Sequence, residues 1–375
     1  MKALFVATVQ SHIAQFHMGA AALLKKSGYD VDVAAKDNLG EKNGLALQNV
    51  DEVFNVPFER SPFSLRNIRA YKELKKIINE GNYDLIHCNT PVGGILTRLA
   101  ARKVRKKGCC VIYTAHGFHF YKGAPKKNWI LFYPIEKEMA RLTDKLITIN
   151  EEDYNLASQK FACATYHVHG VGIKTQKYDA ITNKRALEFR ASKGWDKDFL
   201  ILCTGELNTN KNQKTIIKAM ERVASEVPNA RLLLAGNGPD EQKLLDLIRE
   251  YCLEDNITLL GYRTDLELYV HACDVVVSAS FREGLPLNIV EAMYCKKPVI
   301  ASINRGHNEL IKDKENGFLV PANDYESFAD YIIRLARNLD ERINFGKAGF
   351  LRSLKYADKS VVEELRVIYE LGERK

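Results

Sequence analysis

The sequence predicts an α/β protein made of two doubly wound domains, each a parallel sheet with helices on both faces. Short β-branched runs alternate with amphipathic stretches, and this rhythm restarts in the second half after a glycine-containing break. The length of 375 residues suits two or three domains, each able to bury its own core. With 46% hydrophobic residues, 27% charged residues and ten prolines, a disordered or collagen-like chain is excluded.

Each expected strand is a short apolar run that ends in a polar or glycine-containing segment. Ligands bind outside the carboxyl ends of the strands in such sheets, so the residues that directly follow strands are the first candidates for a site. The strands expected in the first half are 4–8, 31–35, 84–88, 111–114 and 145–149, and those in the second half are 199–204, 231–235, 257–260, 274–278 and 298–301.

Two glycines mark the break between the halves. Gly170 and Gly172 follow an apolar run, and no helical period resumes before about residue 183. We therefore expect a first domain over residues 1–169, a linker over 170–182 and a second domain over 183–354. Residues 355–375 carry apolar side chains at helical spacing, which predicts a terminal helix that could pack back on the first domain.

The basic residues are concentrated in one half of the chain. Residues 1–170 hold 24 Lys and Arg against 16 Asp and Glu, a net charge of +8, whereas residues 171–375 hold 31 of each. This excess indicates an anionic partner, either membrane headgroups or nucleic acid, or else a solvated face with cations at a helix end. No apolar run reaches the roughly 18 residues of a spanning helix, and the first residues do not form a signal sequence, so we expect a cytoplasmic protein.

The strongest candidate site is the segment 281–293, FREGLPLNIVEAM. It follows an expected strand, and its Gly and Pro suit a loop before a helix that begins near Leu287. Free backbone amides at such a helix start bind phosphate well. We expect Glu291 in the first helical turn, within reach of ligand hydroxyls, and Glu283 in the preceding loop. The alternative is structural: Glu291 would complement the helix dipole and Glu283 would be solvated.

The two glutamates, separated by seven residues within EGLPLNIVEAM, resemble the signature of the retaining glycosyltransferases of family 4, which adopt the GT-B fold of two Rossmann-like domains. The resemblance implies a cleft between the domains in which a nucleotide-sugar binds. It covers nearly the whole chain: the glycine linker after His169, the GNGP turn at 236–239, the GYR segment at 261–263, the NGFLV segment at 316–320 and the terminal helix.

The resemblance also implies roles for single residues. Glu291 would bind the ribose hydroxyls, Glu283 would hold hydroxyls of the transferred sugar, and Lys211 would neutralise the diphosphate. His116, in TAHGF, matches a family histidine beside the donor sugar. The alternatives are an ordinary surface lysine and a structural histidine. Catalysis is thus assigned to Glu283, His116 and Lys211, and donor binding to Gly205, Arg263, Leu287, Asn288, Ile289 and Glu291.

Two positions depart from the family pattern. The family usually has an arginine after the glycine matched by Gly205, where this chain has Glu206. Either Lys211, the helix amides and a nearby Arg263 or Arg282 hold the diphosphate, or Glu206 turns away and orients Lys211. The first loop has Gln-Ser-His at 10–12 where many relatives have Gly-Gly. A subgroup of bacterial polysaccharide enzymes carries GELN and HGFHF segments like those of this chain.

No metal site or resident cofactor is expected. His116 with His119, and His167 with His169, are spaced like ligand pairs but lack Cys or carboxylate ligands at useful spacing. The turn at 236–241 starts like a dinucleotide fingerprint but lacks its third glycine, so NAD binding is not expected. The leaving diphosphate would then be stabilised by Lys211 and helix-end amides.

The first domain is expected to meet the acceptor, as the resemblance implies. After the strand at 111–114 it presents aromatic residues interleaved with lysines, which suits a membrane interface with anionic headgroups. The alternative is that the aromatics are core and the lysines solvated. The residues assigned to this surface are Phe118, Phe120, Tyr121, Lys122, Lys126 and Lys127.

We therefore expect a retaining, metal-independent transferase that moves a sugar from a UDP-sugar to a polyprenyl-diphosphate-linked saccharide in surface polysaccharide assembly, as a peripheral protein of the cytoplasmic membrane. A sugar-nucleotide epimerase of the same fold and a non-catalytic nucleotide-sugar-binding partner, which Glu206 keeps open, are the alternatives. Nucleic-acid binding would explain the basic half but leave Glu283, Glu291 and Lys211 without a role.

Overall fold

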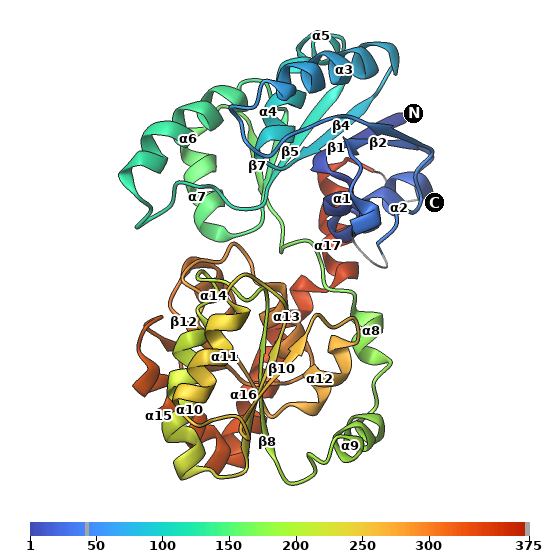
Figure 1. The fold of residues 1–375 in the computed structure, drawn as a ribbon. Coiled ribbons are helices and arrows are strands. Elements are labelled where there is room, and N and C mark those ends of the chain that lie inside the picture. Colours follow the sequence, from blue (N-terminus) through green and yellow to red (C-terminus); the bar gives the residue numbers. More distant parts are fainter. Residues whose placement is uncertain (42–44, 372–375) are drawn as a thin grey trace. The chain divides into compact units, whose positions relative to one another are not determined.

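The computed structural model describes residues 1–41 and 45–371. Residues 42–44 and 372–375, which fall within the first and last predicted segments, lie outside this described part. The chain divides into two compact units (Figure 1): Met1–Gly172 with Asp358–Lys375, and Ile173–Ala357. Each unit contains one parallel sheet, so the predicted fold class of two doubly wound domains is confirmed.

The sheet of the first unit has seven parallel strands in the order β3-β2-β1-β4-β5-β6-β7. This order lets helices cover both faces. Its strands are β1 (Lys2–Val9), β2 (Asp30–Lys36), β3 (Glu52–Asn55), β4 (Leu85–Asn89), β5 (Cys110–Ala115), β6 (Lys145–Thr148) and β7 (Ala164–His167). Its helices are α1 (Gln10–Phe16), α2 (Met18–Lys26), α3 (Arg66–Glu80), α4 (Pro91–Ala100), α5 (Arg102–Arg105), α6 (Lys126–Ala140), α7 (Glu151–Lys160) and α17 (Asp358–Ile368), with a 3-10 turn η1 (Leu39–Glu41).

Alternate residues of β1 face opposite sides of this sheet. Leu4 and Val6 pack with residues of α3, α4, α6 and α7, whereas Phe5 and Ala7 pack with residues of α1, α2 and α17. Figure 1 shows α17 (red) beside α1 and α2 (blue), although more than 300 residues of chain separate them. The terminal helix is anchored there by a buried hydrogen bond of 2.6 Å between the Tyr369 hydroxyl and Nδ1 of His87.

The sheet of the second unit has six parallel strands in the order β10-β9-β8-β11-β12-β13. They are β8 (Phe199–Thr204), β9 (Ala230–Ala235), β10 (Ile257–Gly261), β11 (Val275–Ser278), β12 (Val299–Ser302) and β13 (Gly317–Val320). The helices are α8 (Thr175–Asp179), α9 (Asn183–Ser192), α10 (Gln213–Glu226), α11 (Glu241–Glu250), α12 (Leu266–Ala272), α13 (Leu287–Tyr294), α14 (Arg305–Leu310), α15 (Tyr325–Arg337) and α16 (Leu339–Ser353), with a 3-10 turn η2 (Leu354–Tyr356).

Local sequence pattern missed some short elements. The strands β3, β7 and β13 have four residues each and lie at sheet edges, where pairing on one side leaves little apolar signal. The segment predicted as a linker, 170–182, contains the five-residue helix α8, which is too short to show a helical period. Among the described residues, no helix combines the length and the hydropathy needed to cross a bilayer.

Candidate functional site

The candidate site of the second unit lies at the carboxyl ends of β8 and β9, where two glycines let the backbones touch. Gly205 follows β8 with φ +144°, and Gly236 follows β9 with φ +149°. A Cβ on Gly236 would lie 1.9 Å from the Gly205 carbonyl oxygen, so no larger residue fits there without moving the main chain. A Cβ on Gly205 would lie 3.1 Å from Cε of Lys211. Gly205 therefore lets the Lys211 side chain pass close over the backbone.

Lys211 and Glu283 meet at this edge of the sheet. Lys211 comes from the loop between β8 and α10, and Glu283 from the loop between β11 and α13. Nζ of Lys211 donates to Oε1 of Glu283 at 2.7 Å, with side-chain exposures of 23% and 13%. Because β8 and β11 are neighbours in the sheet, their following loops are adjacent. The sequence predicted that Lys211 and Glu283 converge around one bound donor, and the structure brings them together in a direct ion pair.

The α14 helix packs directly against the Glu283 loop. A Cβ on Gly306 would lie 2.8 Å from Cβ of Glu283, so the small residue permits the close approach. The Arg305 guanidinium donates a long bond of 3.4 Å to the Glu283 carbonyl. The segment that follows β12 therefore also helps to fix the backbone of Glu283, in addition to the segments that follow β8 and β11.

Glu206 is connected to Lys211 through one intervening side chain, that of Asn208. Its exposed carboxylate accepts from Nδ2 of Asn208 at 2.9 Å. Oδ1 of Asn208 in turn accepts from the Lys211 backbone amide at 3.0 Å. Glu206 therefore shapes the loop through Asn208, and the ammonium of Lys211 is held by Glu283 instead.

Glu291 is the fifth residue of α13 and lies in its second turn, so the expected first-turn position was wrong. The helix begins at Leu287, directly after Pro286, and Glu291 packs against α8. Burial raises the pKa of the Glu291 carboxyl to about 7, and a hydrogen bond with the Tyr178 side chain opposes that rise. The alternative that Glu291 complements the helix dipole requires a position in the first turn, and Glu291 lies beyond it.

The start of α13 carries the three other residues assigned to the donor on this helix. Nδ2 of Asn288 donates to the Thr204 carbonyl at 3.2 Å, which ties the helix start to the end of β8. The Ile289 side chain is fully buried, and its amide donates to the Pro286 carbonyl at 3.2 Å. Leu287 is half-buried and packs against the core between α12 and α13. Within the described chain, no side chain caps this helix start.

Arg263 is engaged by a neighbouring carboxylate. Its Nε and Nη2 donate to the two oxygens of Asp265 at 2.8 and 2.7 Å, and its guanidinium lies 5.3 Å from the Tyr269 ring centre. An incoming diphosphate would compete with Asp265 for this cation. The Arg282 side chain is exposed, while its carbonyl accepts from Nδ2 of Asn210 at 3.1 Å.

In the first unit, His116 belongs to a group of histidines that the sequence spacing did not reveal. Its Nε2 lies 3.1 Å from Nε2 of His12, and one nitrogen from each of His12, His17 and His116 lies within 4.8 Å of the others. His119 instead stacks against Phe132, with ring centres 4.7 Å apart. The strand order explains why His12 and His116 meet. His12 follows β1 and His116 follows β5, and both strands border β4.

Phe118 and Phe120 are core residues, so their assignment to a membrane surface was wrong. They are 4% and 1% exposed and stack on each other with ring centres 4.8 Å apart. The loop after β5 turns back over the sheet, and Trp129 of α6 covers Phe120. Of the other residues assigned to that surface, Tyr121 is half-buried and Lys122, Lys126 and Lys127 are exposed.

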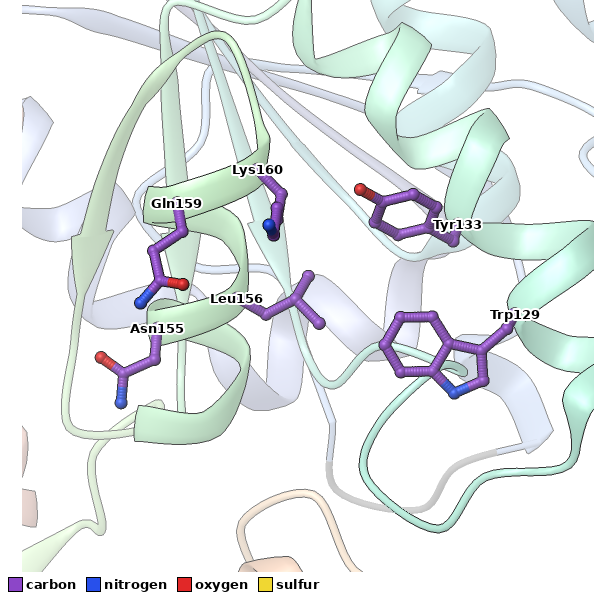
Figure 2. Close-up of a pocket in the computed structure, with 6 residues that line it drawn as sticks. All are labelled: Trp129, Tyr133, Asn155, Leu156, Gln159 and Lys160. Carbon is purple, nitrogen blue, oxygen red and sulfur yellow. The ribbon is translucent and has the colours of Figure 1, made fainter.

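A hollow of about 300 Å³ lies between α6 and α7. Figure 2 shows Trp129 and Tyr133 on one side of it, facing Leu156 and Lys160 of α7. On the same α6 helix, the side chains of Ile130 and Leu131 are 76% and 44% exposed. Asn155 and Gln159 complete the lining.

Two family models match the chain. Residues 186–352 match the model described as glycosyl transferases group 1, and residues 2–150 match the one described as glycosyl transferase 4-like. Bacillus subtilis EpsD, whose name describes it as a glycosyltransferase, is 41% identical over 98% of this chain and 96% of its own. The Escherichia coli UDP-Gal:alpha-D-GlcNAc-diphosphoundecaprenol alpha-1,3-galactosyltransferase is 27% identical over 84% of this chain and 81% of its own.

Solved structures show the same architecture. HepE of Anabaena, crystallised with UDP, superposes with a TM-score of 0.79 at 20% identity over 99% of this chain and 100% of its own. The same protein crystallised with UDP-glucose superposes with a TM-score of 0.75 at 20% identity, over 99% of this chain and 100% of its own. Together with the two parallel sheets, this likeness identifies the fold as GT-B.

Proposed function

The chain belongs to the glycosyltransferases, and we propose that it acts in bacterial surface polysaccharide synthesis, where it transfers a sugar from a UDP-sugar to a lipid-linked saccharide with retention of the anomeric configuration. The main observation in support of the proposal is the ion pair between Nζ of Lys211 and Oε1 of Glu283, which lie 2.7 Å apart. It sets a cation for a diphosphate beside a carboxylate that can hold sugar hydroxyls.

The UDP part of the proposal rests on relatives and on Glu291. The Escherichia coli relative is named for a UDP-sugar donor, and HepE was crystallised with UDP and with UDP-glucose. We assign the ribose hydroxyls to the Glu291 carboxylate. Gly205, Asn288 and the first turn of α13 would hold the phosphates through backbone groups. Arg263 could also bind the phosphates, but its guanidinium would then remain partly paired with the Asp265 carboxylate.

In the proposed reaction the bond between the anomeric carbon and the diphosphate oxygen breaks. A new bond forms from the acceptor oxygen to the same face of that carbon, and the acceptor's proton passes to the departing phosphate oxygen. Lys211 stabilises the charge that develops on the diphosphate, and such preorganised charge is worth several kcal/mol in other enzymes. Glu283 orients the sugar by accepting bonds from its hydroxyls. We propose no metal-dependent step.

His116 is proposed to assist transfer as a neutral imidazole. Burial, reinforced by His12 and His87, holds the pKa of His116 well below its usual range. An uncharged ring can accept or donate a hydrogen bond to a hydroxyl without competing for the diphosphate. This role is distinct from that of Lys211, which acts through charge.

The acceptor is proposed to be a prenyl-diphosphate-linked saccharide that the enzyme reaches at the cytoplasmic face of the membrane. The Escherichia coli relative is named for such an acceptor. The first turn of α6 carries Lys126 and Lys127, followed by the exposed Ile130 and Leu131, a combination that suits anionic headgroups over an apolar layer. The hollow beside Lys160 supports the same assignment, because two aromatic rings and an ammonium suit a prenyl phosphate.

Glu283→Gln tests the transfer reaction. With a panel of UDP- and GDP-sugars and a prenyl-diphosphate-linked saccharide, we expect acceptor-dependent release of UDP to fall about 100-fold in Glu283→Gln, because the sugar loses an anionic hydrogen-bond acceptor. Glu221→Gln, which alters an exposed carboxylate of α10, is the control. Wild-type rates in Glu283→Gln, or an epimer formed from the donor alone, would contradict the proposal.

Membrane association is tested separately. Co-sedimentation with vesicles that contain anionic lipid should fall several-fold in Ile130→Asp, because a charge replaces an exposed apolar contact. Leu351→Asp, at a position of the second unit that is 69% exposed, is the matched control. Equal sedimentation of all three proteins, or no dependence on anionic lipid, would count against a membrane face on α6.

A further inference from the structure

Three histidine rings converge in the first unit from two separate segments of the chain. His12 lies in α1 and His17 at the junction of α1 and α2, while His116 follows β5. The ring centres of His12 and His116 are 4.6 Å apart, and each lies 5.4 Å from that of His17. One nitrogen from each ring falls within 4.8 Å of the others.

The three rings are shielded from water to different degrees: His17 is buried, and His12 and His116 are half-buried. Burial lowers the pKa of His12 to about 4, and burial together with the neighbouring histidines holds the pKa values of His17 and His116 well below the usual range. Neutral imidazoles offer lone pairs rather than positive charge, so this group suits a cation and not a phosphate. His17 is 4% exposed, and its Nε2 has no hydrogen-bond partner among the described residues. A buried, unsatisfied nitrogen of this kind calls for a ligand.

We infer that His12, His17 and His116 form a three-histidine site for a divalent transition metal of the zinc class. With Zn–N bonds of 2.0–2.1 Å, tetrahedral ligand nitrogens lie about 3.3 Å apart. The His12 and His116 nitrogens already lie 3.1 Å apart, and the His17 nitrogen lies within 4.8 Å of them, so a small inward movement of the rings would complete the site. Imidazole is the ligand that zinc, copper and nickel favour.

Two buried neighbours, Asn89 and His87, surround the three rings. Oδ1 of the fully buried Asn89 lies 3.4 Å from Nε2 of His116, close enough to complete the coordination or to face a bound water. His87 packs beside His17 but is not a candidate ligand, because its nitrogens bond the Tyr369 hydroxyl at 2.6 Å and the Thr114 hydroxyl at 2.7 Å. His87 thus connects the site to Tyr369, the residue that directly follows α17.

Metal binding would replace the present contact between His12 and His116. That contact requires one ring to carry its proton on Nε2. To ligate through Nε2, that ring must carry the proton on Nδ1 instead, a change of tautomer that releases no proton. A metal on Nε2 of His116 would leave only Nδ1 of that ring for a substrate hydroxyl, so metal binding and hydroxyl binding at Nε2 exclude each other. The inference does not rest on glycosyl transfer, and the site is tested without donor or acceptor.

Titration of the full-length protein, freed of any histidine tag, with Zn²⁺ in a calorimeter and with Co²⁺ in a spectrophotometer tests the site. We expect one equivalent of either metal and Co²⁺ ligand-field bands of low coordination number. His12→Gln and His116→Gln should each weaken Zn²⁺ binding by about tenfold or more, because each removes a ligand. His119→Gln, whose ring stacks on Phe132 nearby, should bind like the wild type.

Thermal unfolding without metal shows whether each variant is folded. His12 is half-buried, so its replacement should leave the core in place. Saturating Zn²⁺ should raise the unfolding temperature of the wild type and of His119→Gln, but not that of His12→Gln. Absence of a stoichiometric site, or equal affinity in folded His12→Gln and His116→Gln, would overturn the inference. An equal loss in His119→Gln would also overturn it.

Discussion

Nζ of Lys211 lies 2.7 Å from Oε1 of Glu283, across 72 residues of chain. The pair joins the loop after β8 to the loop after β11 and leaves both side chains partly shielded from water. A diphosphate that approaches Lys211 must share the ammonium with this carboxylate. Affinity for the nucleotide is therefore a balance between the new anion and the resident one.

The two partners should consequently have opposite effects on UDP binding. Lys211→Met removes a charge-assisted bond worth about 1.5–3 kcal/mol and should raise the Kd for UDP by about 10- to 100-fold. Glu283→Gln should leave that Kd unchanged or lower it a few-fold, because it removes the competing anion. Calorimetry measures both, with Lys214→Met, an exposed lysine at the start of α10, as the control. Weaker UDP binding in Glu283→Gln than in Lys211→Met would refute this balance.

Binding of UDP-glucose should strengthen as the pH rises from 6 to 8. The pKa of Glu291 is raised to about 7 by burial, and only the carboxylate can accept bonds from both ribose hydroxyls. Each pH unit below that pKa should weaken binding by up to about tenfold. The phosphates of a UDP-sugar are diesters and do not titrate in this range. Glu291→Gln should bind weakly at every pH, and a pH slope that persists in this variant would exclude Glu291 as its origin.

The same carboxyl should make the protein less stable at higher pH. The ordinary pKa of 4.5 applies in the unfolded chain and about 7 in the folded one, so the folded state holds the proton more tightly. The stability that this group contributes is fully present below pH 4.5 and is lost as the pH rises through 7. Glu291→Gln should not show this loss, and at pH 8 it should gain up to about 3 kcal/mol over the wild type. Unfolding temperatures at pH 5 and pH 8 measure the difference, and equal shifts at both would contradict it.

Gly236→Ala should destabilise the second unit strongly. The new Cβ would lie 1.9 Å from the Gly205 carbonyl oxygen, and φ of +149° disfavours any side chain. Together the clash and the strained backbone should cost about 3 kcal/mol or more. Gly194→Ala gives the cost of a positive φ without a clash, because Gly194 has φ +71° and its Cβ would meet nothing within 4 Å. Thermal unfolding should show a much smaller loss in Gly194→Ala, and equal losses would rule out the clash.

Local pattern was sufficient for the broad architecture. Buried parallel strands such as β1 and β8 are continuous apolar runs, and amphipathic helices separate them, so the sequence alone predicted two doubly wound domains. Loops that follow strands could be located for the same reason, which singled out Glu283, Lys211 and His116. The resemblance to known enzymes rested on the residues of these loops.

Only the tertiary structure decided which of these residues meet. Strand order differs from chain order, so β8 lies beside β11, and loops that are 72 residues apart bring Lys211 to Glu283. The convergence of His12 with His116 has the same origin, because β1 and β5 both border β4. Burial also depends on contacts between distant segments. Such contacts place Phe118 and Phe120 in the core, and burial raises the pKa of Glu291. The periodicity of apolar residues indicates whether a segment forms a helix or a strand. Which side chains meet, and which lose contact with water, depends on the other segments that pack against it.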